Sequence, residues 1–159
     1  MKIKNLLLAC FIITGLTACE KGDSIDTEMA TLTGKWFQEG KCCNDWFVQD
    51  LYHFKNDQTF EITKGVIDRN TKVIMGYLSR TTGAFEVVGD SLVLKDSKYY
   101  FVTTNDSYKK LEELTYSHTT KLRSYKLVYN TNLDSLTLIY PCPPNAYCRA
   151  NPKLIRVLK

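Results

Sequence analysis

Alternation of apolar and polar residues runs through most of the chain from Leu32 onward. The alternating runs are short and are separated by turn-forming residues, whereas helical spacing is scarce. Period-two spacing puts every second side chain on the same side of a strand, which indicates an antiparallel sheet with one apolar and one polar face. The expected fold class is therefore all-β, an antiparallel meander closed or half-closed into a barrel, because closure removes exposed sheet edges.

Eleven runs are candidate strands. They are Gly34–Glu39, Phe47–Phe54, Thr59–Thr63, Lys72–Ser79, Gly83–Val88, Ser91–Lys95, Tyr99–Thr103, Leu111–Ser117, Leu122–Tyr129, Ser135–Tyr140 and Lys153–Leu158. Two turns stand out between them. Lys55–Gln58 links two strands, and Gly89-Asp90 suits a two-residue hairpin. The run Leu111–Ser117 is ambiguous, since the letters KKLEEL at its start also suit a helical turn.

The alternation also predicts which side chains point into the barrel. They are Trp36, Phe54, Phe60, Ile62, Phe85, Val87, Leu92, Leu94, Tyr125, Leu127, Leu136 and Leu138. Lysine, glutamate, aspartate and threonine occupy many of the positions between them, so the outer face is expected to be wet. A sheet of nine or more such strands must curl or stack to bury its apolar face.

Residues 1–18 have the layout of a secretory signal peptide. A positive start at Met1–Lys4 is followed by an apolar run at Leu6–Ile13 and by small residues up to Ala18. The apolar run is shorter than the roughly 20 residues that span a bilayer. A buried N-terminal helix is the alternative interpretation.

The segment Leu16-Thr17-Ala18-Cys19 resembles the lipobox of bacterial lipoproteins. In that family the cysteine thiol receives a diacylglyceryl group and the chain is cut just before it. The resemblance implies that Cys19 begins the mature protein and carries acyl chains such as palmitate, and that the protein is anchored in a Gram-negative cell envelope, at the outer membrane. Each buried acyl methylene contributes about 0.8 kcal/mol to such anchoring. Ordinary secretion, with Cys19 free or paired, is the alternative.

Removal of 18 from 159 residues leaves 141, which is enough for one domain with a hydrophobic core. Residues 19–30 are mostly polar and are interpreted as the lipidated cysteine and a flexible tether, and residues 31–159 as the barrel domain. Loss of Lys2 and Lys4 lowers the formal net charge from +4 to +2. So small a charge does not indicate a nucleic-acid partner.

The first predicted strand carries a family resemblance. Leu32-Thr33-Gly34-Lys35-Trp36 resembles the G-x-W of lipocalins, and the stretches LYHFKNDQTFEI, TTGAFEVVGDSLVLKD and YKLVYNTNLDSLTLIY extend the likeness. Together they resemble the lipocalin-like domain of bacterial lipoproteins, which implies a small barrel behind a lipidated cysteine. The resemblance also implies that Trp36 closes one barrel end and that Arg156 packs across it, a cation–π contact of about 0.5–2 kcal/mol. The alternative is that Trp36 is ordinary core and Arg156 is a surface residue.

The chain has six cysteines, of which Cys10 lies in the expected signal peptide and Cys19 is the expected lipidation site. The four that remain for the folded part are Cys42, Cys43, Cys142 and Cys148. An even number in an exported chain indicates disulfides rather than zinc, for which no C-x-x-C spacing is present. In a closed meander the first and last strands are neighbours, so both cysteine pairs are expected at one rim. Cross-pairs between the two loops are favoured, each contributing about 2–4 kcal/mol. The competing pairing joins Cys142 to Cys148 and leaves Cys42 and Cys43 to form a vicinal disulfide, which would be strained.

The letters Gly89-Asp90-Ser91-Leu92 spell the GDSL motif of a hydrolase family whose serine is the nucleophile. That chemistry needs a histidine base, usually late in the chain behind an aspartate. No Asp-x-x-His occurs here, and the two histidines are His53 and His118. The residues after Ser91 alternate like a strand, so a hairpin is preferred to a nucleophile turn.

The expected function is therefore non-enzymatic, with no cofactor or metal. The leading hypothesis is that the barrel interior binds a small apolar or amphipathic ligand. Tyr77, Tyr100, Tyr125 and Tyr129 are the candidate ligand-binding residues, because aromatic walls with polar tips suit such pockets. A structural or protein-interaction lipoprotein with a filled barrel is the second hypothesis, and hydrolysis at Ser91 is the third. The volume of the interior separates the first two.

Overall fold

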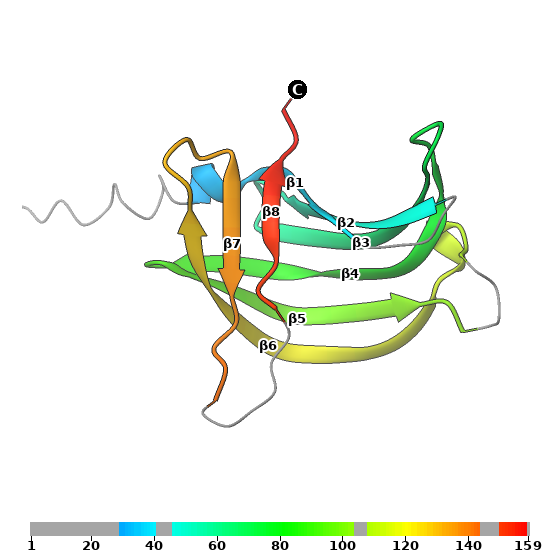
Figure 1. Cartoon of the computed structure of the whole chain (residues 1–159). Helices are drawn as coiled ribbons and strands as arrows, with labels where there is room; N and C mark the ends of the chain where they lie inside the picture. The colour runs from blue at the N-terminus through cyan, green and yellow to red at the C-terminus, as the bar shows by residue number, and fades with distance from the viewer. Residues whose placement is uncertain (1–28, 41–45, 104–107, 144–149, 159) are drawn as a thin grey trace, which may run out of the picture.

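The protein is described by a computed structural model over residues 29–40, 46–103, 108–143 and 150–158. Within these residues eight strands form a closed barrel, in which each strand pairs antiparallel with its sequence neighbours and the last strand pairs with the first (Figure 1). The strands are β1 (Gly34–Glu39), β2 (Trp46–Phe54), β3 (Thr59–Asp68), β4 (Ile74–Val88), β5 (Ser91–Phe101), β6 (Thr115–Tyr129), β7 (Ser135–Ile139) and β8 (Lys153–Arg156). The all-β class and the antiparallel meander are confirmed.

Eight strands replace the eleven predicted ones because three pairs of neighbouring runs are continuous. The runs beginning at Lys72 and Gly83 join in β4, those beginning at Ser91 and Tyr99 join in β5, and the last part of Leu111–Ser117 joins Leu122–Tyr129 in β6. The start of that last run is the 3₁₀ turn η1 (Leu111–Glu113), as its KKLEEL letters allowed. Polar residues between the runs stay extended because strands on both sides supply hydrogen-bond partners.

The joined strands contain bulges, at which the register with a neighbouring strand shifts. Between Thr82 and Ala84 of β4 the partner residue on β5 moves from Lys98 to Lys95, so β5 holds one extra residue there. Asp96 lies at this point with a positive φ of 47°. Opposite the bulge, a Cβ added to Gly83 would lie 2.6 Å from the Lys95 carbonyl oxygen, so this position requires glycine. A bulge bends and twists its strand, which helps to curve the wall of the barrel.

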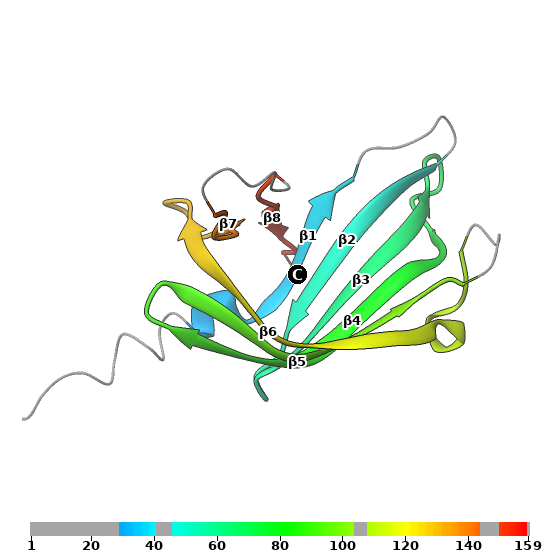
Figure 2. The same ribbon diagram turned by 90° about the horizontal axis from the view of Figure 1, so that it is seen from below.

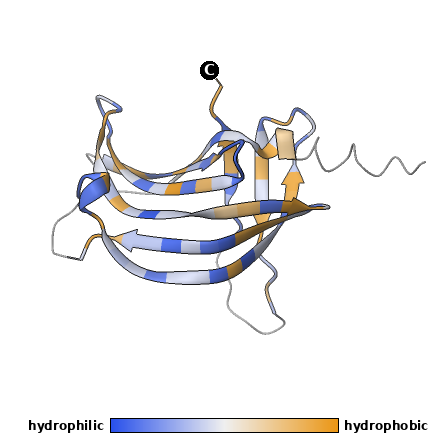
Figure 3. Cartoon of the chain, turned by 180° about the vertical axis from the view of Figure 1, so that it is seen from behind, coloured by the Kyte–Doolittle hydropathy of each residue, from blue (hydrophilic) through white to orange (hydrophobic). Residues whose placement is uncertain are grey.

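The barrel has a narrow closed end and a wide end. Strands β1, β7 and β8 have six, five and four residues, whereas β2 to β6 have between nine and fifteen. Figure 2 shows β2 to β6 flaring away from the three short strands as a curved sheet. In Figure 3 the long strands are mostly hydrophilic along the flare and become hydrophobic toward the closed end. The sequence thus divides the interior into an apolar end and a polar end.

The hydrophobic core fills the closed end. Its buried members are Leu32, Trp36, Phe54, Phe60, Phe85, Val87, Leu92, Leu94, Leu127, Leu136, Leu138 and Leu154. Ten of the twelve side chains predicted to point inward are among them, and Ile62 and Tyr125 pack against them partly buried. The prediction is confirmed for all twelve. It missed Leu32, which precedes the first predicted strand, and Leu154 on the short strand β8.

A turn of helix at residues 29–32 lies against the closed end. Trp36 Nε1 donates a hydrogen bond to the Leu32 carbonyl oxygen at 2.7 Å, and the Arg156 guanidinium lies 4.3 Å from the centre of the Trp36 ring. Arg156 also donates to the carbonyl oxygen of Thr31. The contact expected between Trp36 and Arg156 is therefore present. Met29 and Ala30, expected at the end of the tether, belong to this turn.

Both predicted turns connect strands as expected. Gly89-Asp90 joins β4 to β5, with Val88 paired to Ser91 and a φ of 57° at Gly89 that suits glycine. Lys55–Gln58 joins β2 to β3, closed by a hydrogen bond from the Gln58 amide to the Lys55 carbonyl oxygen. These short connections keep sequence neighbours adjacent in the barrel.

Several expectations fall outside the described residues. They are the signal peptide, the lipidation of Cys19 and most of the tether, together with Cys42, Cys43 and Cys148. No helix within the described ranges is long and apolar enough to cross a membrane.

The closed end generates a first prediction. Replacing Arg156 with Met removes the cation–π contact and a charged hydrogen bond, so we expect the free energy of unfolding to fall by about 2 kcal/mol. The measurement is urea denaturation of the full chain. Lys153→Met, at an exposed position of the same strand, is the control and should change stability by less than about 0.5 kcal/mol. Equal effects of the two substitutions would contradict the role assigned to Arg156.

Candidate ligand-binding cavity

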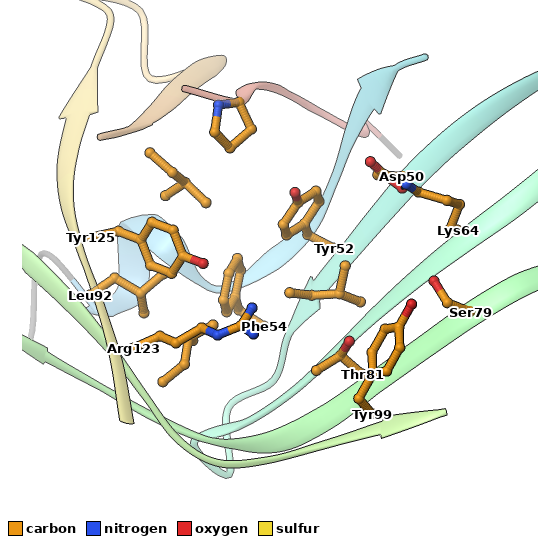
Figure 4. Close-up of a pocket in the computed structure, with 14 residues that line it drawn as sticks. Asp50, Tyr52, Phe54, Lys64, Ser79, Thr81, Leu92, Tyr99, Arg123 and Tyr125 are labelled. Atoms are coloured by element: carbon orange, nitrogen blue, oxygen red, sulfur yellow. The ribbon is translucent and has the colours of Figure 1, made fainter. Parts of the chain in front are cut away.

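An open cavity of about 220 Å³ lies inside the barrel, between the hydrophobic core and the flared strands (Figure 4). Its lining comes from strands β2 to β7 and from the segment before β8. The residues that line it are Asp50, Tyr52, Phe54, Ile62, Lys64, Ser79, Thr81, Leu92, Leu94, Tyr99, Arg123, Tyr125, Leu138 and Pro152. The described side chains therefore fill the interior at one end only.

The hydrophobic core forms the apolar side of the cavity, which we call its floor. Phe54, Leu92, Leu94 and Leu138 are buried core members that also line the cavity. They reach it because inward-facing positions alternate along β2, β5 and β7. An apolar floor of this kind favours the hydrocarbon part of a ligand.

Two opposite charges face each other on one wall. Asp50 of β2 pairs with Lys64 of β3 across the strands, and the Lys64 Nζ lies 3.7 Å from Asp50 Oδ1. Burial raises the pKa of Asp50 above its usual value, and the nearby Lys64 ammonium opposes that rise. The pair places one compensated carboxylate at the edge of the cavity.

Hydroxyl groups supply most of the remaining polar lining. Tyr52, Tyr99 and Tyr125 contribute phenols, and Ser79 and Thr81 contribute alcohols. Burial raises the pKa of the Tyr52 phenol, with a smaller contribution from the Asp50 carboxylate. Tyr52 therefore keeps its proton at neutral pH and remains a hydrogen-bond donor. Figure 4 shows the hydroxyls of Tyr52 and Tyr125 directed into the cavity.

The four tyrosines predicted for ligand binding do not gather in one place. Tyr125 lines the cavity, and Tyr129 packs at the closed end, with its ring centre 6.4 Å from that of Trp36. Tyr77 lines a separate outer groove. Tyr100 forms an edge-on contact with Tyr116, at 5.7 Å between ring centres. Of these positions only Tyr125 keeps the expected place in the cavity wall.

Bulges explain why Tyr77 and Tyr100 face outward. Simple alternation from Leu94 would turn Tyr100 inward, but the extra residue at Asp96 reverses the alternation and turns Tyr99 inward instead. The register between β3 and β4 also shifts next to Tyr77. A bulge of one residue exchanges the two faces of a strand. Aspartate tolerates the positive φ found at Asp96, so the residue type at this position is a weak signal in the sequence.

The outer groove, of about 200 Å³, lies on the opposite face of the sheet. Leu51 and His53 line it because they alternate with the inward Tyr52 and Phe54, and Tyr77 and Leu111 complete its apolar part. Burial lowers the pKa of His53, helped by the charges of two neighbouring lysines and opposed by two neighbouring carboxylates.

Ser91 lies in the tight β4–β5 hairpin, where its hydroxyl donates to Asp90 Oδ1 at 3.3 Å. It pairs with Lys126 of β6, whereas His118 sits eight residues earlier on that strand. At 3.3 Å per residue this separation is about 26 Å. His53 belongs to β2, between β1 and β3. Neither histidine is in place to activate Ser91.

The described part of the chain shows no cluster of side chains of the kinds that bind metal ions. Among the described residues no set of three or more histidine, cysteine, aspartate or glutamate side chains is arranged to hold a metal ion. Cys142 follows β7 at an exposed position. Its expected pairing involves cysteines outside the described residues and stays a prediction.

The raised pKa of Asp50 predicts a pH effect on stability. A folded-state pKa above the unfolded value means that the folded protein binds the proton more tightly, so this group costs stability as pH rises from about 4 through the folded pKa. Asp50→Asn removes the cost, so the variant should gain stability relative to the wild type as the pH rises above about 4. Urea denaturation at each pH measures the difference.

Asp57 is the control for this experiment, because hydrogen bonds from Thr59 lower the pKa of its exposed carboxylate. Its stabilising contribution is present above the ordinary aspartate pKa and is lost as pH falls below it. Asp57→Asn should therefore lose its disadvantage as pH falls below about 4, so its stability relative to the wild type changes with pH in the opposite direction to that of Asp50→Asn. The same trend in both variants would contradict the assignment to Asp50.

Comparison with known proteins adds no relative: no family model matches the chain, and no curated protein matches it.

Proposed function

We propose that this chain is a lipid-anchored cell-envelope lipoprotein whose barrel binds a small amphipathic ligand without catalysing a reaction. The observation that carries the proposal is the open cavity of about 220 Å³ between the core and the flared strands. Its apolar floor and hydroxyl-rich walls match the composition of ligand pockets. The likeness of the sequence to lipocalin-like domains supports the same function by analogy.

The size of the cavity limits what enters it. A volume of 220 Å³ is below the roughly 300–1,000 Å³ of typical ligand pockets. We infer that a ligand places one short apolar segment on the floor formed by Phe54, Leu92 and Leu94, while the rest lies along the flared sheet.

The anchor rests on the sequence Leu16-Thr17-Ala18-Cys19. Mass spectrometry of the mature N-terminus should find Cys19 as the first residue, carrying a diacylglyceryl group. The wild-type protein should be recovered with membranes, and Cys19→Ser should be recovered in the soluble fraction. An unmodified Cys19 in the mature protein would exclude the anchor.

Ligand binding is tested by photolabelling the full chain in lipid nanodiscs with a neutral eight-carbon alcohol that carries a diazirine. Labelled residues should map to β2, β5 and β6 around the cavity. Thr81→Phe fills the cavity and should reduce labelling there at least tenfold. Thr82→Phe is the control, because Thr82 pairs with the outward Glu61 on the opposite face of β4. Circular dichroism checks that both variants fold.

A protein-interaction role is the second candidate, and the outer groove favours it. Leu51, Tyr77 and Leu111 place apolar surface on the outside of the barrel. The photolabelling experiment separates the two candidates. Labelling confined to the outer groove, or equal in Thr81→Phe and the wild type, would reject the interior site.

A further inference from the structure

Among the described residues that line the cavity, Arg123 is the only arginine. It pairs with the inward Leu94 across β5 and β6, which directs its side chain to the interior. Figure 4 shows its guanidinium group extending across the cavity toward Phe54, below Tyr125. The side chain is solvent-accessible. A fixed positive charge thus stands beside the apolar floor.

The other charges of the described residues do not neutralise Arg123. Inside the cavity, Asp50 is already paired with Lys64. The remaining ion pairs in the described part of the chain are Arg80–Glu61, Lys95–Glu86 and Lys126–Asp90, and none of them lines the cavity. Arg123 itself makes no ion pair or hydrogen bond with another described side chain. Within the described part of the chain, Arg123 is therefore a positive charge in the cavity that no described side chain compensates.

Hydrogen-bond donors lie in the same cavity as this charge. The phenols of Tyr52, Tyr99 and Tyr125 line it, and Thr81 adds an aliphatic hydroxyl. Tyr52 stays protonated, as its burial dictates. A guanidinium group binds a carboxylate through two parallel hydrogen bonds, and neighbouring hydroxyls satisfy the lone pairs that remain.

We propose that the cavity selects an amphipathic monocarboxylate, with Arg123 binding the carboxylate and Phe54, Leu92 and Leu94 contacting the first carbons of its chain. The inference rests on the proposed ligand-binding function and names the chemical class of its ligand. A neutral or cationic headgroup would leave Arg123 without a partner or would repel it. The difference between ligands of equal chain length is therefore the quantity to measure.

The experiment is competition against the neutral diazirine alcohol, with the full chain in nanodiscs at pH 7.5. The competitors are octanoate, 1-octanol and octylamine, and empty nanodiscs correct for partition into lipid. We expect octanoate to compete at least tenfold better than 1-octanol and octylamine to compete worst. Arg123→Gln should remove the preference for octanoate while leaving competition by 1-octanol within about twofold of the wild type.

Two further variants make the result specific. Arg69→Gln removes an exposed arginine in the β3–β4 turn, away from the cavity lining, and should keep the full preference. Arg123→Lys restores the charge without the planar fork and should recover part of it. Equal competition by octanoate and 1-octanol, or a preference that survives Arg123→Gln, overturns the carboxylate inference and leaves the proposed function intact. No specific labelling with the neutral probe overturns both.

Discussion

Pairing of the four-residue strand β8 with both β1 and β7 is the constraint on which the barrel depends. Without it β1 and β7 would be open sheet edges, and Trp36, Leu136 and Leu154 would lose the closed surface that buries them. So short a strand offers few ladder hydrogen bonds. The side chain of Arg156 reinforces it, since it contacts the Trp36 ring and the Thr31 carbonyl oxygen. Closure of the barrel and burial of its core therefore depend on the same short strand, at one end of the molecule.

Concentrating closure at one end explains why the interior is not filled. The long strands β2 to β6 continue beyond the short ones, and their inward positions change from large apolar side chains to hydroxyls and charges. Such side chains need hydrogen-bond partners or water, so they do not collapse into a dry core. The cavity lies between the apolar side chains of the closed end and the polar side chains of the flared strands. The cavity therefore has hydrocarbon side chains of the core on one side and hydroxyl-bearing and charged side chains on the other.

Much of the fold could be predicted from the sequence, and the site could be predicted only in part. Period-two alternation identified the inward side chains of the core, from Trp36 to Leu138, because each lies within an unbroken ladder. Tyr100, expected in the cavity wall as an aromatic residue with a polar tip, faces outward, and Tyr99 faces the cavity instead, because the bulge at Asp96 exchanges the two faces of β5. Asp50, Lys64 and Arg123 were not expected in the interior, because a charged residue in a strand usually faces water. They continue the inward positions of Phe54, Ile62 and Tyr125, and the flare of the barrel leaves an open interior surface for them.

Connecting each strand to its neighbour in sequence has a consequence for how the chain folds. Hairpins such as β4–β5 close short loops and are entropically cheap, whereas Trp36 must find Arg156 some 120 residues later. The curved sheet β1 to β7 is thus expected to assemble first, with its oily surface exposed until the final strand arrives. Until β8 pairs with them, β1 and β7 would each present an unpaired edge, and unpaired sheet edges promote self-association.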